Sequence, residues 1–175
     1  RRSSDLDNIF GSGNGLPMVI NPSGTLDLNG KSIFISNFSS SGTIDNTSAI
    51  GSTLNIGKNN TGGTLSGTIQ NTGGGALNLF KFGDSNTTNL TGLNTYTGIT
   101  RVLGGTLTFN SIANVSAGAS ALGAPATIAA GTISLGNGNS TAGTVGALRY
   151  TGTTPASTDR VINLVGTTAG GTLNA

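Results

Sequence analysis

The side chains that could do acid–base or metal chemistry are six aspartates, because the chain has no glutamate, histidine or cysteine. They are Asp5, Asp7, Asp27, Asp45, Asp84 and Asp159. Two carboxyl groups held close together would suit carbohydrate cleavage, and Asp27 and Asp45 could form such a pair across two turns of a coiled chain. Asp5 and Asp7 could bind calcium through their carboxylate oxygens.

Spacing argues against both kinds of site. The aspartates are scattered over 175 residues without a cluster, and no histidine is available as a general base. Some solenoids bind calcium through a repeated Gly-Gly-x-Gly-x-Asp pattern, to which Gly83-Asp84 is only faintly similar. The sequence therefore predicts a protein that is not an enzyme, with no catalytic residue, no metal site and no cofactor.

Composition narrows the class of protein further. The chain has 30 glycines and only 8% charged residues, with a net charge of +2 that is too small to indicate a nucleic-acid partner. No apolar run approaches the roughly 20 residues of a membrane helix, so we expect no membrane insertion by this segment. Regular spacing of leucine, isoleucine and valine argues against the disorder that the polar composition would otherwise suggest.

The chain repeats itself. The heptapeptide Ser41–Thr47 returns as Ser66–Thr72 with six of seven residues identical, 25 positions later. An apolar-x-apolar pair recurs at steps of 28, 23, 30, 26 and 29 residues. The six pairs are Leu26/Leu28, Leu54/Ile56, Leu77/Leu79, Leu107/Phe109, Ile133/Leu135 and Ile162/Leu164. We interpret the chain as a repeat array.

Each repeat has the pattern of short strands. Segments of four to seven residues alternate between apolar and polar side chains, which is the period of a strand rather than a helix. Such strands, recurring every 23 to 30 residues, predict an all-β fold, a parallel β-solenoid of about six coils. Glycine and asparagine are expected at the corners, where tight bends require positive φ. The alternative is an antiparallel β-sandwich, for which Asn29-Gly30 is the one hairpin signal.

A stretch at 90–107 resembles a known family. Its pattern of L-T-G, N-T-Y-T-G, T-x-V and G-T-L is similar to the autotransporter-associated β-strand repeat, also called the passenger-associated transport repeat. The residues that carry the resemblance are Leu90, Thr91, Gly92, Asn94, Tyr96, Thr97, Gly98, Thr100, Val102, Gly105 and Leu107. Arg101 replaces the commoner threonine and is expected to point outward.

The resemblance implies a right-handed parallel β-helix from a large secreted or cell-surface bacterial protein. We expect residues 1–20 to form a lead-in or partial cap and residues 21–175 to form the coils. The expected function is that of a passenger-like stalk or scaffold at the outer surface of the cell, whose partners are neighbouring coils or copies of itself packed end to end into a fibre. The alternative is an adhesin or glycan-binding module that uses one outer face and would present an exposed aromatic row or a cleft. Tyr96, Tyr150 and five phenylalanines (Phe34, Phe38, Phe80, Phe82 and Phe109) are expected instead to fill the core.

Overall fold

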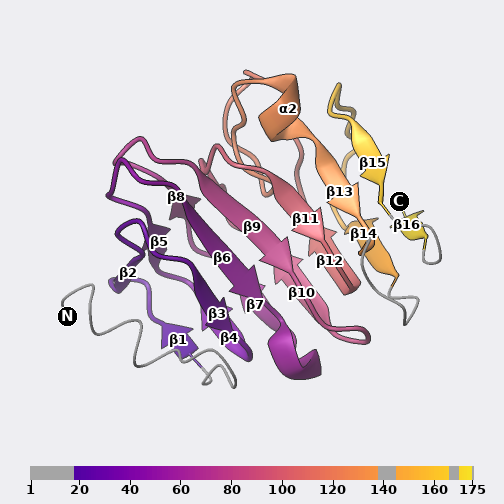
Figure 1. Cartoon of the computed structure of the whole chain (residues 1–175). Coiled ribbons are helices and arrows are strands. Elements are labelled where there is room, and N and C mark those ends of the chain that lie inside the picture. The colour runs from indigo at the N-terminus through magenta and orange to yellow at the C-terminus, as the bar shows by residue number, and fades with distance from the viewer. Residues whose placement is uncertain (1–17, 138–144, 166–169, 175) are drawn as a thin grey trace.

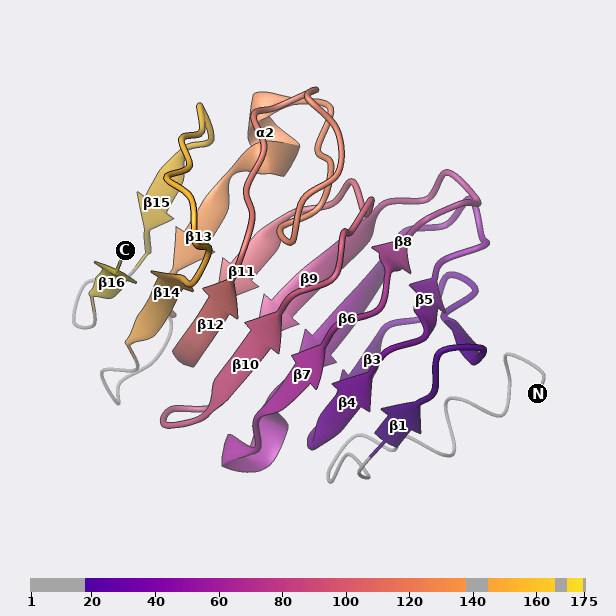
Figure 2. The same cartoon turned by 180° about the vertical axis from the view of Figure 1, so that it is seen from behind.

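A computed structural model describes residues 18–137, 145–165 and 170–174, and it is a parallel β-solenoid. The strands form three sheets in which every strand pairing is parallel. The six-stranded sheet faces the viewer in Figure 1 and the seven-stranded sheet does so in Figure 2. This architecture confirms the predicted fold class and excludes the antiparallel sandwich. No helix in the described part of the chain is long and apolar enough to span a membrane.

The strands are short, and each sheet takes one strand from successive coils. The seven-stranded sheet contains β1 (Met18–Ile20), β4 (Phe38–Ser40), β7 (Gly63–Leu65), β10 (Thr87–Leu90), β12 (Gly105–Phe109), β14 (Gly146–Tyr150) and β16 (Gly171–Asn174). The six-stranded sheet contains β3 (Ile33–Ile35), β6 (Ser52–Ile56), β9 (Leu77–Lys81), β11 (Thr100–Val102), β13 (Ile133–Leu135) and β15 (Ile162–Leu164). The three-stranded sheet contains β2 (Thr25–Asp27), β5 (Thr43–Asp45) and β8 (Ile69–Gln70).

Two helical turns interrupt the strands in the described part of the chain. A 3₁₀ turn covers Lys58–Asn60 between β6 and β7, and α2 covers Ile128–Gly131 before β13. The chain from 110 to 131 leaves the regular coil and carries α2 at its end (Figure 1). A lone antiparallel bridge between Asn94 and Ser120 attaches this excursion to the preceding coil.

The register of the paired strands confirms the heptapeptide repeat, but it differs from the predicted alignment of the apolar-x-apolar pairs. Ile44 pairs with Ile69, at the 25-residue offset of the heptapeptides. In the six-stranded sheet Leu54 pairs with Leu79, so the predicted match of Leu54 to Leu77 is wrong by two residues. Two of the six pairs belong to other sheets, Leu26/Leu28 at β2 and Leu107/Phe109 in β12. The apolar-x-apolar pattern misled because the inward faces of all three sheets share it.

The core consists of inward-facing ladders, as expected for a solenoid. In the six-stranded sheet one ladder is Ile33, Leu54, Leu79, Thr100, Ile133 and Ile162. The next is Ile35, Ile56, Lys81, Val102, Leu135 and Leu164. Every member of the first ladder from Ile33 to Ile133 is buried, because the coils above and below cover it.

Candidate functional site

The motif at 90–107 builds nearly one complete coil. Leu90 ends β10, and it pairs with Phe109 of β12 in the same sheet one coil later. Between them the chain passes through the six-stranded sheet as β11, in which Thr100 and Val102 face inward and are buried. Arg101 lies between them on the exposed outer side, as predicted. The residues of the motif at 90–107 therefore occupy inward positions and corners of a single coil.

Beyond β8, the last strand of the three-stranded sheet, asparagine side chains form the hydrogen bonds that a further paired strand would form. Asn94 is fully buried, and its Oδ1 accepts a hydrogen bond from the Ile69 N–H at 2.8 Å. Its Nδ2 donates to the Ala121 carbonyl at 2.7 Å, which ties the previous coil to the excursion above. Thr97 donates its N–H to Asn71 Oδ1 at 2.8 Å. These bonds satisfy backbone groups that would otherwise be buried without partners.

Tyr96 fills the interior of the same coil. Its side chain is fully buried and its hydroxyl lies 2.8 Å from Thr100 Oγ1. Burial raises the pKa of Tyr96 to about 12, although the Thr100 hydrogen bond and the positive charge of Arg160 oppose the shift. The Arg160 guanidinium is itself buried and donates to the carbonyls of Leu122 and Gly123. The prediction that tyrosine fills the core is confirmed for Tyr96.

The raised pKa of Tyr96 predicts a loss of stability in strong alkali. The neutral phenol is favoured in the folded chain, so its contribution is complete below pH 10 and declines as pH rises towards the folded pKa of about 12. We expect the free energy of unfolding to fall by about 2 kcal/mol between pH 9.5 and 11.5. Urea unfolding at the two pH values measures it, and Tyr96→Phe should remove most of the fall. An equal fall in Tyr96→Phe would contradict the assignment.

The hypothesis that Asp27 and Asp45 face each other across coils is confirmed, because they pair in register. Each carboxylate, however, serves a threonine of the next coil. Asp27 Oδ2 accepts from the Thr47 hydroxyl at 2.7 Å, and Asp45 Oδ2 accepts from the Thr72 hydroxyl at 2.8 Å. The backbone N–H groups of the same threonines donate to the Oδ1 atoms. The two aspartates are therefore capping residues of a repeating corner.

Asp45 is the buried member of this pair, so we expect its removal to be the more costly. Asp45→Ala should lower the free energy of unfolding by about 2 kcal/mol, because three hydrogen bonds from Thr72 and Gln70 to a buried carboxylate are lost. The matched control is Asp27→Ala, which removes three bonds, from Asn29 and Thr47, at a half-exposed position and should cost about 1 kcal/mol or less. Denaturant unfolding measures both, and equal losses would contradict this explanation.

Of the remaining aspartates, Asp84 and Asp159 lie in the described part of the chain. Asp5 and Asp7 lie outside the described residues, as does most of the predicted lead-in at 1–20. Asp159 Oδ1 accepts from the Val115 N–H at 2.8 Å. Within the described residues no three acidic, histidine or cysteine side chains come close enough to hold a metal ion.

The outer face of the six-stranded sheet carries a cluster of three phenylalanine side chains. We call it the aromatic face, and it comprises Phe34 of β3, Phe80 of β9 and the following Phe82. All three rings are half-buried on the outside of the coil, so the prediction that they fill the core is wrong, whereas Phe38 and Phe109 are buried as expected. Phe34 and Phe82 contact each other with ring centroids 5.7 Å apart.

Two cations lie on the aromatic face. Lys58 Nζ is 4.8 Å from the centroid of the Phe34 ring, and the Arg101 guanidinium carbon is 5.2 Å from that of Phe80. Beyond Arg101 the same face is hollowed by a groove of about 330 Å³. Its lining residues are Arg101, Leu103, Ser134, Gly136, Asn137, Asn163 and Val165, none of them acidic.

Sequence reasoning missed Lys81, the most unusual polar residue of the interior. It stands in an inward ladder between Ile56 and Val102, where an apolar side chain is expected, and none of its surface is exposed. Burial lowers the pKa of Lys81 to about 8, and the nearby charge of Asp84 offsets only part of the shift. The available signal was the 25-residue offset of the heptapeptides, which places Lys81 opposite Ile56 as the structure does.

Comparison with known proteins gives no assignment. No protein-family model matches this chain, and neither a curated protein nor a solved structure matches it.

Proposed function

We propose that this chain is a structural, non-catalytic segment of a large secreted or cell-surface bacterial protein, similar to the passenger stalk of an autotransporter. The observation that supports this proposal best is the placement of the motif residues. Leu90, Asn94, Tyr96, Thr100 and Val102 are all buried within one coil, where each serves packing or backbone pairing. They form a stacking unit, which is what a scaffold requires.

The proposed mechanism is mechanical. Each coil pairs in parallel with the coils before and after it, and the backbone hydrogen bonds are continuous along the rod. A repeat whose coils contact only their neighbours can fold progressively from one end. Such folding outside the membrane would help to draw the rest of the chain through a transport pore.

Surface display tests the scaffold proposal. The chain is placed between a secretion signal and the translocator barrel of a well-characterised autotransporter, and surface exposure is measured with an antibody and by protease shaving. We expect the chain to reach the cell surface and to remain resistant to protease. Retention in the periplasm while the barrel is correctly assembled would overturn the proposal.

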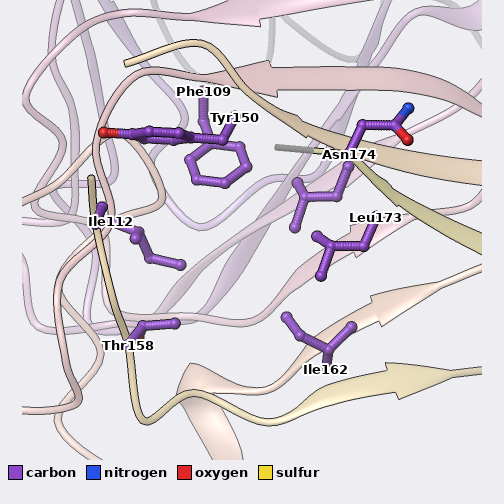
Figure 3. Close-up of a pocket in the computed structure, with 9 residues that line it drawn as sticks. Phe109, Ile112, Tyr150, Thr158, Ile162, Leu173 and Asn174 are labelled. Atoms are coloured by element: carbon purple, nitrogen blue, oxygen red, sulfur yellow. The ribbon is translucent and has the colours of Figure 1, made fainter. Parts of the chain in front are cut away.

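The C-terminal end of the rod favours packing against a further coil. A cavity of about 180 Å³ opens there between the two larger sheets, with Phe109, Tyr150, Ile162 and Leu173 in its wall (Figure 3). Leu164 and Leu173 on the last described strands are 63% and 60% exposed, so their ladders continue into solvent. We propose that a neighbouring coil or the opposite end of a second copy covers this surface.

Electron microscopy of the purified chain tests end-to-end packing. Rods that associate into thin filaments are expected, and Leu164→Asp with Leu173→Asp should shorten them because charges would be placed in the contact. The matched control is Leu93→Asp, at a leucine that is 63% exposed between β10 and β11 in the middle of the rod. Single rods at all concentrations would contradict end-to-end packing by this chain.

A second candidate function, glycan binding, is favoured by the aromatic face and its groove. Half-exposed rings can pack against sugar rings, and Arg101, in a groove lined by no acidic residue, favours an anionic polysaccharide. Isothermal titration with a sulphated or uronic-acid polysaccharide tests it. Arg101→Ala should weaken binding about tenfold, whereas Arg149→Ala, an exposed arginine on the seven-stranded sheet, should not. Equal effects of the two variants would mean nonspecific charge attraction and would overturn this assignment.

A further inference from the structure

The interior corner that follows β9 brings an amine and a carboxamide together out of water. Lys81 is fully buried and Asn86 is 7% exposed. Lys81 Nζ donates hydrogen bonds to the carbonyls of Phe82 at 2.7 Å and Gly104 at 3.0 Å. Its third hydrogen bond goes to the side-chain oxygen of Asn86, Oδ1.

The Asn86 amide is held in one orientation. Its Nδ2 donates to the Gly57 carbonyl at 2.6 Å and to the Thr61 carbonyl at 2.8 Å, both on the preceding coil. The Oδ1 and Cγ side of the amide is thereby fixed towards Lys81. Two reacting groups held in contact by the fold replace a bimolecular encounter, which is a large part of the barrier to amide formation.

We propose that Lys81 and Asn86 are joined by an intramolecular isopeptide bond, formed by the folded chain without another reactant. The Nζ lone pair attacks Cγ of Asn86, and the bond between Cγ and Nδ2 breaks with its electron pair going to nitrogen. A proton leaves Nζ and reaches the departing nitrogen, so that the lysine ammonium and the carboxamide become a secondary amide and an ammonium ion. No oxidant or reductant is consumed.

The surroundings support each part of this step. Burial lowers the pKa of Lys81 to about 8, so a usable fraction of the amine is uncharged near neutral pH. The leaving nitrogen already faces two carbonyl oxygens, which can accept hydrogen bonds from the ammonia as it gains its proton. The product also removes a buried positive charge from an apolar ladder, which makes the linked corner more stable than the unlinked one.

The bond adds to the scaffold role and does not depend on it. It would close a ring from the last residue of β9 to the residue before β10, at the corner between the two large sheets. Pulling or proteolysis at that corner would then leave the six-stranded and seven-stranded sheets covalently joined. The proposed modification is a cross-link that the chain forms by itself, without a bound ligand.

Intact mass spectrometry of the purified, folded chain tests the proposal. We expect a mass below the sequence value by one ammonia, about 17 Da, and no tryptic cleavage after Lys81 once the chain is denatured. Lys81→Met should restore the full mass for its sequence, while Lys58→Met, which removes an outer lysine, should keep the deficit. Asn86→Asp should lose one water, about 18 Da, in place of ammonia.

Two outcomes would overturn the proposal. One is a folded wild-type chain with its full sequence mass and ready tryptic cleavage after Lys81. The other is a deficit that survives in Lys81→Met, because it would then arise from cyclisation of an asparagine on its own backbone. An unlinked Lys81 also has a pH signature: with its folded pKa of about 8 below its usual value, stability would rise as pH increases above 8. The linked chain should lack this rise.

Discussion

Gly67→Ala should destabilise the protein by about 3 kcal/mol or more, although it adds one methyl group. Gly67 follows β7, at the corner where each coil leaves the seven-stranded sheet. A Cβ atom built on it would lie 1.8 Å from the carbonyl oxygen of Gly42 on the coil below. That oxygen belongs to the backbone, so the clash is relieved only if the two coils separate.

The same close approach repeats along the rod. A Cβ on Gly92 would lie 1.8 Å from the Gly67 carbonyl oxygen, so Gly42, Gly67 and Gly92 form a column without side chains. The Ser66 and Thr91 N–H groups beside the column donate to carbonyls of the coil below. We therefore expect Gly92→Ala to cost as much as Gly67→Ala.

Gly170→Ala is the matched control for these substitutions. A Cβ on Gly170 meets nothing within 4 Å, so this change should stay within about 0.5 kcal/mol of the wild type. Denaturant unfolding followed by far-ultraviolet circular dichroism measures all three variants. A loss for Gly67→Ala no larger than that for Gly170→Ala would contradict the close stacking of the coils.

Tyr96→Ala should cost about 3–5 kcal/mol, because the largest fully buried side chain in the described structure would be replaced by a cavity. The ring contacts Gly123 closely enough that a Cβ there would lie 2.9 Å from its Cε2 and Cζ atoms. The excursion above would therefore lose its main support. Tyr96→Phe keeps the ring and removes the hydroxyl that bonds Thr100, so it should cost only about 1 kcal/mol.

The control for Tyr96→Ala lies in the same motif. Leu93 is 63% exposed, so Leu93→Ala should change the free energy of unfolding by less than about 0.5 kcal/mol. Thermal and urea unfolding of the three variants distinguish a packing role for Tyr96 from a surface role. If Tyr96→Ala were as stable as Leu93→Ala, the motif would not act as the interior of a coil.

The strand period and the heptapeptide repeat were sufficient to predict the solenoid. Ser41–Thr47 and Ser66–Thr72 occupy equivalent positions of neighbouring coils, as the pairing of Ile44 with Ile69 shows. A regular period of this kind is a property of the sequence, since neighbouring coils must place similar side chains at similar positions.

The register of individual strands could not be read with the same certainty. Leu77-x-Leu79 matches Leu54-x-Ile56 by residue type, yet the structure pairs Ile56 with Lys81. The true register places a lysine in an apolar ladder, which composition alone argues against. Only the local partners, the Phe82 and Gly104 carbonyls and Asn86, make that placement stable.

Two further features of the structure could not be predicted from the sequence: why some corner glycines are required, and which phenylalanines point outward. Positive φ explains Gly30, Gly57 and Gly105 as predicted. The corner glycines Gly67 and Gly92 are instead required by the closeness of the preceding coil, a contact between residues 25 positions apart. The outward placement of Phe80 likewise follows from strand phase, because Leu79 and Lys81 take the inward positions on either side.

Disulfide cross-linking between coils tests the stacked solenoid most directly, because the native chain has no cysteine. Thr53 and Asn78 pair in register on the outer side of the six-stranded sheet. Thr53→Cys with Asn78→Cys should form a disulfide readily on mild oxidation, since paired parallel strands lie about 4.8 Å apart. Thr53→Cys with Ala76→Cys, the pair implied by the 23-residue offset, should remain reduced. A bond in the second pair and none in the first would contradict the register of the coils.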